Sequence, residues 1–532
     1  MALTIKDFVE QVDSLTLDDV PPEVRKRVND ELQELTGDGE GEPAPPQNPD
    51  AIIVSKNLDG RDGYNNIQPA VDSAEPGATI FVEPGTYTEA VLVETDDLTL
   101  VGAEGVPTVE STGTGYQEEG DPVSPLEIVG EGVEVRDIAV QAVEGEGFNY
   151  GIQISGVSGA SDVTLENVTI DGSSGFNTGE FGTGVRVRGA PNTILDGVEV
   201  NGGSDVDYGI RVQEPGTEVL NCTVNNCNRA IDVQSSDQLV KGNTINGITE
   251  DSPGGWYKDP MDDGLEDDEF PSGKGIRVST TPSGSNNTVE NNEINDCATG
   301  IEAFGSDSNI VGNDITSCST GITVANGASN YTIENNEISE GSSRGISVFS
   351  GSTDAHTIQN NTVSNQASGI VLSGADNNTL SGNTITDNTY NGIWLSDGAG
   401  SATGNDIENN TVSNNGFASS AYPGIYLGGA EDNTLTGNDV NGNAAQGIYV
   451  YDSSGTVVDD NTLENNGEGV GDYIYSGILL WTVTDSEVTN NTLTDNYYRG
   501  IWIESYTDPL TVSGNSITLR DTNYQKIVTN EA

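Results

Sequence analysis

The stretch Gly209-Ile210-Arg211-Val212 is one copy of a four-residue line that recurs along most of this chain. The line is glycine, Ile or Val, a variable residue, and a second apolar residue, and one copy has Ala230 in place of the glycine. The rows begin at Gly151, Gly184, Gly209, Ala230, Gly275, Gly300, Gly321, Gly345, Gly369, Gly392, Gly424, Gly447, Gly477 and Gly500. Most rows lie about 21 to 32 residues apart, and a repeat of that length is typical of a solenoid.

A second repeated line has an asparagine between two short β segments, as at Asn336, Asn383 and Asn438. We expect the same place to be held by Asn221, Asn243, Asn292, Asn313, Asn361, Asn410, Asn461, Asn491 and Asn515. Stacked coils would put these amides in one column, where each can hydrogen-bond the next. The two lines predict three short parallel strands per coil. The expected fold is an all-β, right-handed parallel β-helix of about fourteen to sixteen coils, with a short α-helical N-terminal segment.

The charge of the chain is extreme, with 85 acidic and 19 basic residues among 532 and a formal net charge of −66. Such a chain would repel nucleic-acid phosphates, so we expect no nucleic-acid partner. The balance is typical of proteins from halophilic organisms, because concentrated salt screens the self-repulsion. No apolar run reaches 18 residues, and the first residues lack the features of a secretory signal, so we expect neither a membrane span nor a signal peptide.

The N-terminal part differs in composition from the repeats. Apolar residues follow helical spacing after Thr4 and again after Pro22, which predicts two short amphipathic helices. They are either an unstructured appendage or a segment that needs a partner for its apolar stripes. The second alternative gives a helical docking or oligomerisation segment at 1–36, a flexible linker at 37–49, a β-helix at 50–520 with an acidic inserted loop at 250–274, and a C-terminal tail at 521–532.

The start of the repeats resembles a known superfamily. Ile67-Gln68-Pro69-Ala70-Val71-Asp72, which reads as a short capping helix, is followed by Pro84-Gly85-Thr86-Tyr87. These motifs resemble the opening of pectin-lyase-like right-handed parallel β-helix proteins, and the resemblance covers about residues 50–520. The superfamily includes polysaccharide lyases, polygalacturonases, uronate epimerases, viral tailspikes and a periplasmic copper-maturation protein. The resemblance therefore implies the fold, whereas the activity stays open.

Metal and cysteine chemistry are each represented by one cluster. Cys227, Cys297 and Cys318 hold equivalent places in the repeat and Cys222 lies one strand earlier; we expect buried thiols, since stacked parallel side chains suit a disulfide poorly. The acidic loop is either a halophilic surface loop or a Ca²⁺ site, because hard cations prefer carboxylate oxygens. Calcium is therefore the one cofactor considered, and none is required. Its candidate ligands are Asp259, Asp262, Asp263 and Glu266.

The variable third residue of each row is the most informative position for function. Its apolar neighbours face the core, so it faces outward, and stacking turns it into a column. Eight of the 19 basic residues and three of the four tryptophans lie in or beside these rows. They form either a salt-bridge ladder or a groove for a long anionic glycan, with arginines on acidic groups and aromatic rings on sugars. The candidate binding residues are Arg186, Arg188, Arg344, Trp394, Tyr426, Tyr449, Tyr451, Trp481, Arg499 and Trp502.

Two carboxylates in this column are candidates for catalysis. Asp232 and Glu302 are two coils apart, roughly 9–10 Å by strand spacing, near the separation of inverting glycosidases. Arg211 and Arg277 flank Asp232, and Asp205 or Asp207 could replace it in an alternative pair. The Gly-His-Gly and Asn-Thr-Asp motifs of polygalacturonases and the Tyr-Gly … Asp-Pro-His signature of uronate epimerases are absent. A lyase of the pectate type would use an Arg base beside Ca²⁺-binding carboxylates, and Arg277 beside the acidic loop is compatible with that arrangement.

Two classes of function remain from the sequence. One is a glycan-binding spike of a virus of a halophilic host, which explains the docking segment and linker. It would bind a surface polysaccharide or glycoprotein glycan, attach to other virion proteins through residues 1–36, and form a homo-oligomer, a trimer or else a pentamer at a capsid vertex. The other is a free extracellular lyase, hydrolase or epimerase. A purely structural solenoid is the third alternative, and whether the chain is an enzyme stays open.

Overall fold

The computed structural model describes residues 51–103, 105–110, 124–141, 150–155, 160–172, 182–203, 206–248, 273–278, 284–325, 327–349, 355–397, 402–418, 422–468, 475–520 and 525–529. The chain divides into two units, Met1–Ala51 and Ile52–Ala532, and the second contains the repeats. The expected helices at 1–36, the linker at 37–49 and nearly all of the acidic loop lie outside the described residues, as does most of the tail at 521–532. The described helix is not long and apolar enough to cross a membrane.

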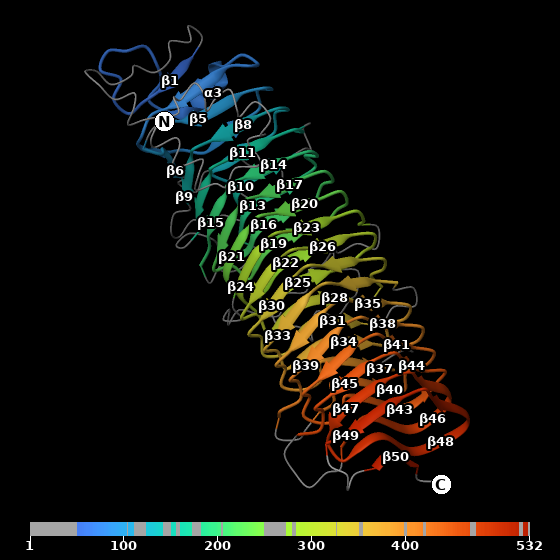
Figure 1. Ribbon diagram of the computed structural model, residues 1–532. Helices are drawn as coiled ribbons and strands as arrows, with labels where there is room; N and C mark the ends of the chain where they lie inside the picture. Colours follow the sequence, from blue (N-terminus) through green and yellow to red (C-terminus); the bar gives the residue numbers. More distant parts are fainter. Residues whose placement is uncertain are drawn as a thin grey trace, which may run out of the picture. The chain divides into compact units, whose positions relative to one another are not determined.

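Ile52–Ala532 folds into stacked coils (Figure 1). Among the described residues, each strand pairs in parallel with the equivalent strands of the neighbouring coils. The first column of strands runs from β1 (Ile52–Val54) through β2 (Thr79–Val82) and β5 (Thr99–Gly102) to β44 (Val457–Asp459). A second column runs from β3 (Thr86–Thr88) to β49 (Ser516–Leu519), with one strand from each of seventeen coils in the described part of the chain. The predicted right-handed parallel β-helix is confirmed. The expected fourteen to sixteen coils are too few, because the coils of β3, β6 (Thr108–Glu110) and β9 (Ala139–Gln141) precede the first glycine row at Gly151.

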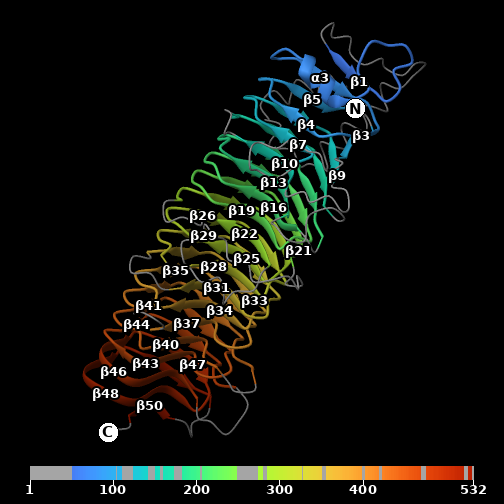
Figure 2. The same cartoon turned by 180° about the vertical axis from the view of Figure 1, so that it is seen from behind.

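The central column contains the strands of the Gly-Ile-x-Val rows, and Figure 2 shows it from behind. Its strands are β4 (Val91–Val93), β7 (Leu126–Ile128), β10 (Tyr150–Ser155), β13 (Gly182–Arg188), β16 (Val206–Val212), β19 (Arg229–Val233), β22 (Lys274–Val278), β25 (Thr299–Ala303), β28 (Thr320–Val324), β31 (Arg344–Phe349), β34 (Ser368–Ser373), β37 (Ile393–Ser396), β40 (Ile425–Gly428), β43 (Ile448–Ser454), β46 (Ser476–Thr489), β48 (Arg499–Ser513) and β50 (Gln525–Thr529). Because β46 and β48 are long enough to pair in both the central and the first column, they join the two at the C-terminal end.

The glycine of each row is required by the core. A Cβ at Gly300 would lie 2.6 Å from Cγ2 of Ile315 and 2.7 Å from the carbonyl oxygen of Gly321. Here the chain bends into the central strand, so the glycine position and the following Ile301 both face inward. Ile301 and Ala303 are fully buried. The row therefore specifies the bend as well as the strand.

A column of asparagines runs beside the core, as expected. Asn292 Nδ2 donates to Asn313 Oδ1 at 2.8 Å, and the same contact repeats from Asn243 to Asn515. The prediction for Asn221 is wrong. That residue is an exposed turn residue with φ of 51°, and Cys222 holds its place in the column. In the other repeats a turn residue with positive φ also precedes the column residue, so the pair shifts by one at this coil.

The N-terminal end of the core is covered by the expected short helix, α3 (Ile67–Ser73), which buries Ile67, Ala70 and Val71. Its first N–H groups are capped by a side chain distant in sequence. The Glu89 carboxylate accepts from the N–H groups of Ile67 at 2.7 Å and Gln68 at 3.0 Å. A carboxylate at this end also suits the helix dipole.

The four cysteines are free and buried, which confirms the expected thiols. Burial raises the pKa of Cys222 and Cys227 to about 12, so both stay protonated at neutral pH. The single histidine, His356, is also a buried part of a side-chain column. Its Nδ1 accepts from the backbone N–H of Tyr331 at 3.1 Å, and the backbone N–H of His356 donates to Asn378 Oδ1 at 2.9 Å.

Candidate functional site

The outward column of the central strands has the register that the sequence predicts. Arg211 pairs with Asp232, Asp232 with Arg277, and Arg277 with Glu302. Further along, Val371 pairs with Trp394, and the order continues through Tyr426, Tyr449, Leu479 and Trp502. One face of the solenoid thus carries a charged half followed by an aromatic half.

The charged half forms ion pairs along the stack. We call Arg211, Asp232, Lys274, Arg277 and Glu302 the charged ladder. Glu302 Oε1 lies 2.9 Å from Lys274 Nζ, and Glu302 Oε2 lies 3.4 Å from Arg277 Nε. Asp232 Oδ2 lies 3.7 Å from Arg211 Nε. These contacts are the ones expected of a salt-bridge ladder, which was one of the two interpretations of the column.

The two candidate catalytic carboxylates are enclosed. Asp232 is 0% exposed and Glu302 is 6% exposed. Asp232 Oδ2 accepts from Gln234 Nε2 at 2.8 Å, whereas Asp232 Oδ1 has no hydrogen-bond partner among the described residues. Glycoside cleavage needs a carboxyl group on each side of the bond. In this arrangement both groups would have to be uncovered before a polymer could reach them.

Several arginines of this half lie over aromatic rings. Arg186 is 4.7 Å from the ring centre of Tyr150 and donates to its hydroxyl at 2.5 Å. Tyr208 lies between Arg211 and Arg229, at 4.6 Å and 5.3 Å. Burial raises the pKa of Tyr208, which keeps its hydroxyl neutral. Such contacts hold the guanidinium groups in place on the strand face.

The other candidate residues of this half have different surroundings. Arg188 and Arg344 are half-buried, and Arg344 lies 5.3 Å from the ring centre of Phe349. Asp207, from the alternative catalytic pair, accepts from Asn228 Nδ2 at 2.8 Å. Asp205 lies outside the described residues, together with the four candidate Ca²⁺ ligands of the acidic loop. In the described part of the chain, no group of three or more His, Cys, Asp or Glu side chains has the arrangement of a metal site.

The aromatic half is more open. We call Trp394, Tyr426, Tyr449, Tyr451, Trp481 and Trp502 the aromatic platform. Neighbouring rings meet edge to face, with centres 5.3 Å apart for Tyr426 and Tyr449 and 5.9 Å apart for Tyr451 and Trp481. Tyr451 is 39% and Trp481 45% exposed, unusually high for rings of this size. A large exposed aromatic surface is typical of a binding site.

Glycine and charge shape the edge of the platform. A Cβ at Gly428 would lie 2.6 Å from the hydroxyl of Tyr426, so this glycine gives the Tyr426 ring room along the surface. Burial raises the pKa of Tyr426, and the nearby carboxylates of Asp397 and Asp452 contribute. Arg499 lies 3.9 Å from the ring centre of Trp502, and burial lowers the pKa of this arginine.

A second group of aromatic residues, which sequence reasoning did not find, lies outside the aromatic platform in the segments that lead into these strands, and we assign it no part in binding. Phe417 is 55% and Tyr390 40% exposed, and the rings of Tyr390 and Tyr422 meet edge to face at 4.9 Å. Each residue precedes a row by more than one position. The available sequence signal was the recurrence of aromatic residues two to seven positions before the glycines of the C-terminal rows.

The class that the fold and this face define is a right-handed parallel β-helix with an outward column of charged and aromatic side chains. Two family models match the sequence. The model described as "Right handed beta helix region" matches residues 265–366 and 349–517. The model described as "Rhamnogalacturonase A/epimerase, pectate lyase-like" matches residues 56–253. Together they support membership of the right-handed β-helix superfamily. No curated protein matches the chain.

Solved structures with a similar fold include proteins of different activity. The Dettilon tailspike protein (gp208) has 18% identity and a TM-score of 0.44, with 80% of this chain and 73% of that chain covered. The periplasmic alginate epimerase AlgG has 15% identity and a TM-score of 0.34, with 88% of this chain and 85% of that chain covered. An alginate lyase from Paenibacillus sp. str. FPU-7 has 14% identity and a TM-score of 0.36, covering 56% and 91%. At these identities the similarity concerns the fold alone.

Proposed function

We propose that the chain is a glycan-binding spike on the virion of a virus whose host lives in concentrated salt. The observation that carries this proposal is the concentration of exposed aromatic rings and of basic side chains on one face of a β-helix, in register from coil to coil. The spike recognises an anionic surface polysaccharide or glycoprotein glycan. Residues 1–36 attach it to other virion proteins, and the functional unit is a homo-oligomer, with a trimer the first expectation and a pentamer the alternative.

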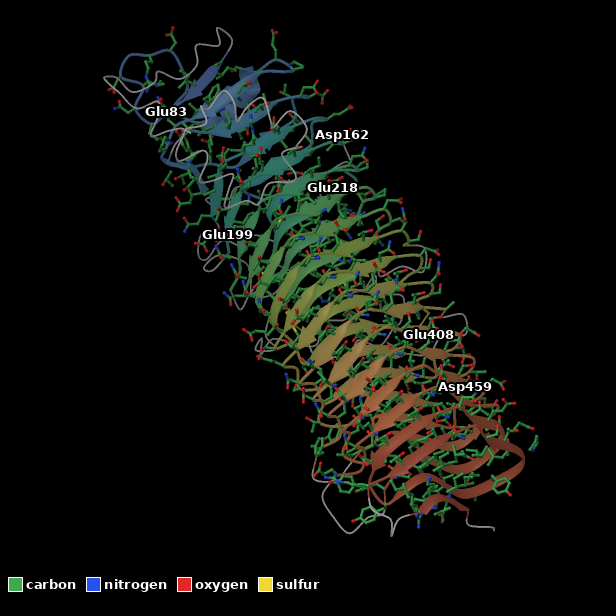
Figure 3. All side chains as sticks on the ribbon, in the orientation of Figure 1. Glu83, Asp162, Glu199, Glu218, Glu408 and Asp459 are labelled. Atoms are coloured by element: carbon green, nitrogen blue, oxygen red, sulfur yellow. The ribbon has the colours of Figure 1, made fainter. Side chains whose placement is uncertain are left out.

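The halophilic assignment rests on the surface charge. Acidic side chains line the solenoid from its first coils to its last, as the labelled residues Glu83, Asp162, Glu199, Glu218, Glu408 and Asp459 illustrate (Figure 3). At physiological ionic strength these charges repel one another over about 8 Å, whereas about 1 M salt shortens that range to ~3 Å. The net charge of −66 is therefore compatible with a folded chain mainly in concentrated salt.

The experiment is a binding assay of the full chain with host surface polysaccharide in high salt, combined with Trp394→Ala and Trp502→Ala. We expect both substitutions to weaken binding; unchanged affinity would remove the aromatic surface from the proposal. Deleting residues 1–49 should abolish attachment to particles and leave the β-structure intact by circular dichroism. A truncated protein that still joins particles would contradict the docking role.

A free extracellular lyase, hydrolase or epimerase is the second candidate, and the match of residues 56–253 to the pectate-lyase-like model favours it. Incubation with the same polysaccharide tests for cleavage by chain length, and for epimerisation by the composition of the uronic acids. Catalysis by the charged ladder predicts that Asp232→Asn abolishes turnover in a protein that remains folded. Turnover that survives in Asp232→Asn and in Glu302→Gln would place any active site elsewhere.

A further inference from the structure

We infer that the aromatic platform binds an uncharged, hydroxyl-rich sugar segment, and that acidic sugars of the same glycan are excluded from it. This inference rests on the proposed glycan-binding function and assigns a substrate class to one half of the face. It also separates the two halves, since an anionic glycan alone would not explain why every platform ring except Trp502 lies in coils without a Lys or Arg in their row.

The first observation is the distribution of basic residues. From Gly345 to Tyr498 the chain has no Lys or Arg, whereas the same 154 residues contain 18 Asp and Glu. Every platform ring except Trp502 lies in this stretch. A carboxylate or sulfate on a bound sugar would therefore find no cation from these coils. It is cations, above all arginines, that bind such groups in bidentate fashion.

The second observation is the position of the nearest charges. The carboxylates of Asp397 and Asp452 lie close enough to the Tyr426 hydroxyl to contribute to its raised pKa, and Glu504 acts in the same way on Tyr449. Asp397 and Asp452 are exposed. The nearest cation in the described coils, Arg499, is held over the Trp502 ring. The edge of the platform is thus acidic, and like charge disfavours an anionic ligand.

The third observation is that this chemistry suits sugar hydroxyl groups. Exposed rings of Tyr451 and Trp481 offer apolar faces against which the C–H groups of a sugar ring can pack, and the surrounding carboxylates can only accept hydrogen bonds. Sugar hydroxyl groups are donors of the matching kind. The combination of aromatic face and acceptor edge recognises a neutral sugar ring by its hydroxyl donors.

The length of the platform sets the size of the ligand. Trp394 and Trp502 are separated by four steps in register, through Tyr426, Tyr449 and Leu479. Four coil spacings correspond to roughly 19 Å along the solenoid. The ligand that fills the platform is therefore a short oligosaccharide segment, and its long axis lies parallel to the stack of coils.

The test uses the full chain and fragments of host surface polysaccharide, separated by anion exchange into neutral and acidic oligosaccharides. Binding of each fraction is measured in about 1 M salt, where the Debye length is ~3 Å and long-range repulsion by the whole protein is suppressed. We expect the neutral fraction to bind, and Trp481→Ala and Tyr451→Ala each to weaken it about tenfold or more. Phe417→Ala, an exposed ring outside the platform, is the matched control and should leave affinity unchanged.

A charge variant makes the inference sharper. Asp397→Asn combined with Asp452→Asn removes two acidic groups from the edge, so the acidic fraction should bind this variant better than the wild type. The inference is overturned if the acidic fraction binds the wild type with an affinity that Trp481→Ala reduces. If intact polysaccharide binds and neither fraction depends on Trp481, the inference fails while the proposed function stands. If no fraction and no intact polysaccharide binds, both fail.

Discussion

The substitution Glu302→Gln separates a structural role of the charged ladder from a catalytic one. Glu302 contacts two cations, Lys274 Nζ at 2.9 Å and Arg277 Nε at 3.4 Å, and the three side chains are only 7–8% exposed. Gln has nearly the same shape but no charge, so both buried cations would lose the negative charge of Glu302. Removing one partner of a buried ion pair costs about 3–5 kcal/mol. We expect a loss of stability of this order.

The measurement is urea unfolding in high salt, because urea leaves the ionic strength constant. The matched control is Glu290→Gln, since Glu290 Oε1 lies 2.7 Å from Lys241 Nζ, with side chains 26% and 49% exposed. A solvent-exposed pair of this kind contributes about 0–1 kcal/mol. The reasoning is refuted if the two variants lose equal stability. A catalytic group held in a strained position would give the opposite result, because Glu302→Gln would then stabilise the protein while abolishing turnover.

Three further predictions concern the stack itself. In Asn361→Ala, two donors of Asn336 lose their acceptor, so the free energy of unfolding should fall by about 2–5 kcal/mol. The control Asn360→Gly, at the exposed neighbouring position, should change the free energy of unfolding little. Equal losses in the two variants would contradict a stabilising role of the asparagine column. Burial lowers the pKa of His356 from 6.5 to about 4. Between these pH values the unfolded chain binds more protons than the folded one, so stability falls by about 3 kcal/mol as the pH drops from 6.5 to 4. His356→Asn should remove this part of the pH dependence of the urea midpoint, and an unchanged pH dependence would disprove the argument. Raising KCl from about 0.1 M to about 1 M should raise the urea midpoint, since the Debye length falls from ~10 Å to ~3 Å, and a midpoint that falls would contradict electrostatic self-repulsion.

The sequence was sufficient to predict which residues of successive coils pair with each other, because every coil repeats the same backbone path from one row glycine to the next. The row glycines mark a bend at which two successive residues face the core. Aligning the glycines aligns the outward residues of the rows, from Gln153 opposite Arg186 to Leu479 opposite Trp502. The predicted register of the asparagine column was wrong by one residue at Asn221. Asparagine occurs both at the turn position and at the column position of this repeat, and the sequence alone did not tell them apart. The turn residue Asn221 is exposed and has a left-handed φ of 51°, whereas the column residue Cys222 is buried.

Burial on the outer face could not be predicted from the repeat. Alternation of residues indicates that Asp232 and Glu302 face away from the core, and outward normally means exposed. Here the side chains of successive coils are only about 4.8 Å apart, so the long arginine and lysine side chains pair with their neighbours and cover the carboxylates between them. The geometry of these ion pairs decides how far the two carboxylates are exposed, and that geometry depends on side-chain rotamers that the sequence pattern does not specify.

The change from charges to rings along the column gives the bound glycan a direction. In the row strands, basic side chains run from Arg186 to Arg344 and reappear only at Arg499. A glycan with acidic and neutral segments that binds as proposed must place its neutral segment over β37 to β48, because the acidic edge there repels the alternative. Its acidic segment then falls toward the half-buried Arg344 and Arg188. Reversing the glycan would bring its acidic sugars to coils that have no Lys or Arg from Gly345 to Tyr498. This difference in binding energy should be largest at low salt, where charges act over longer distances.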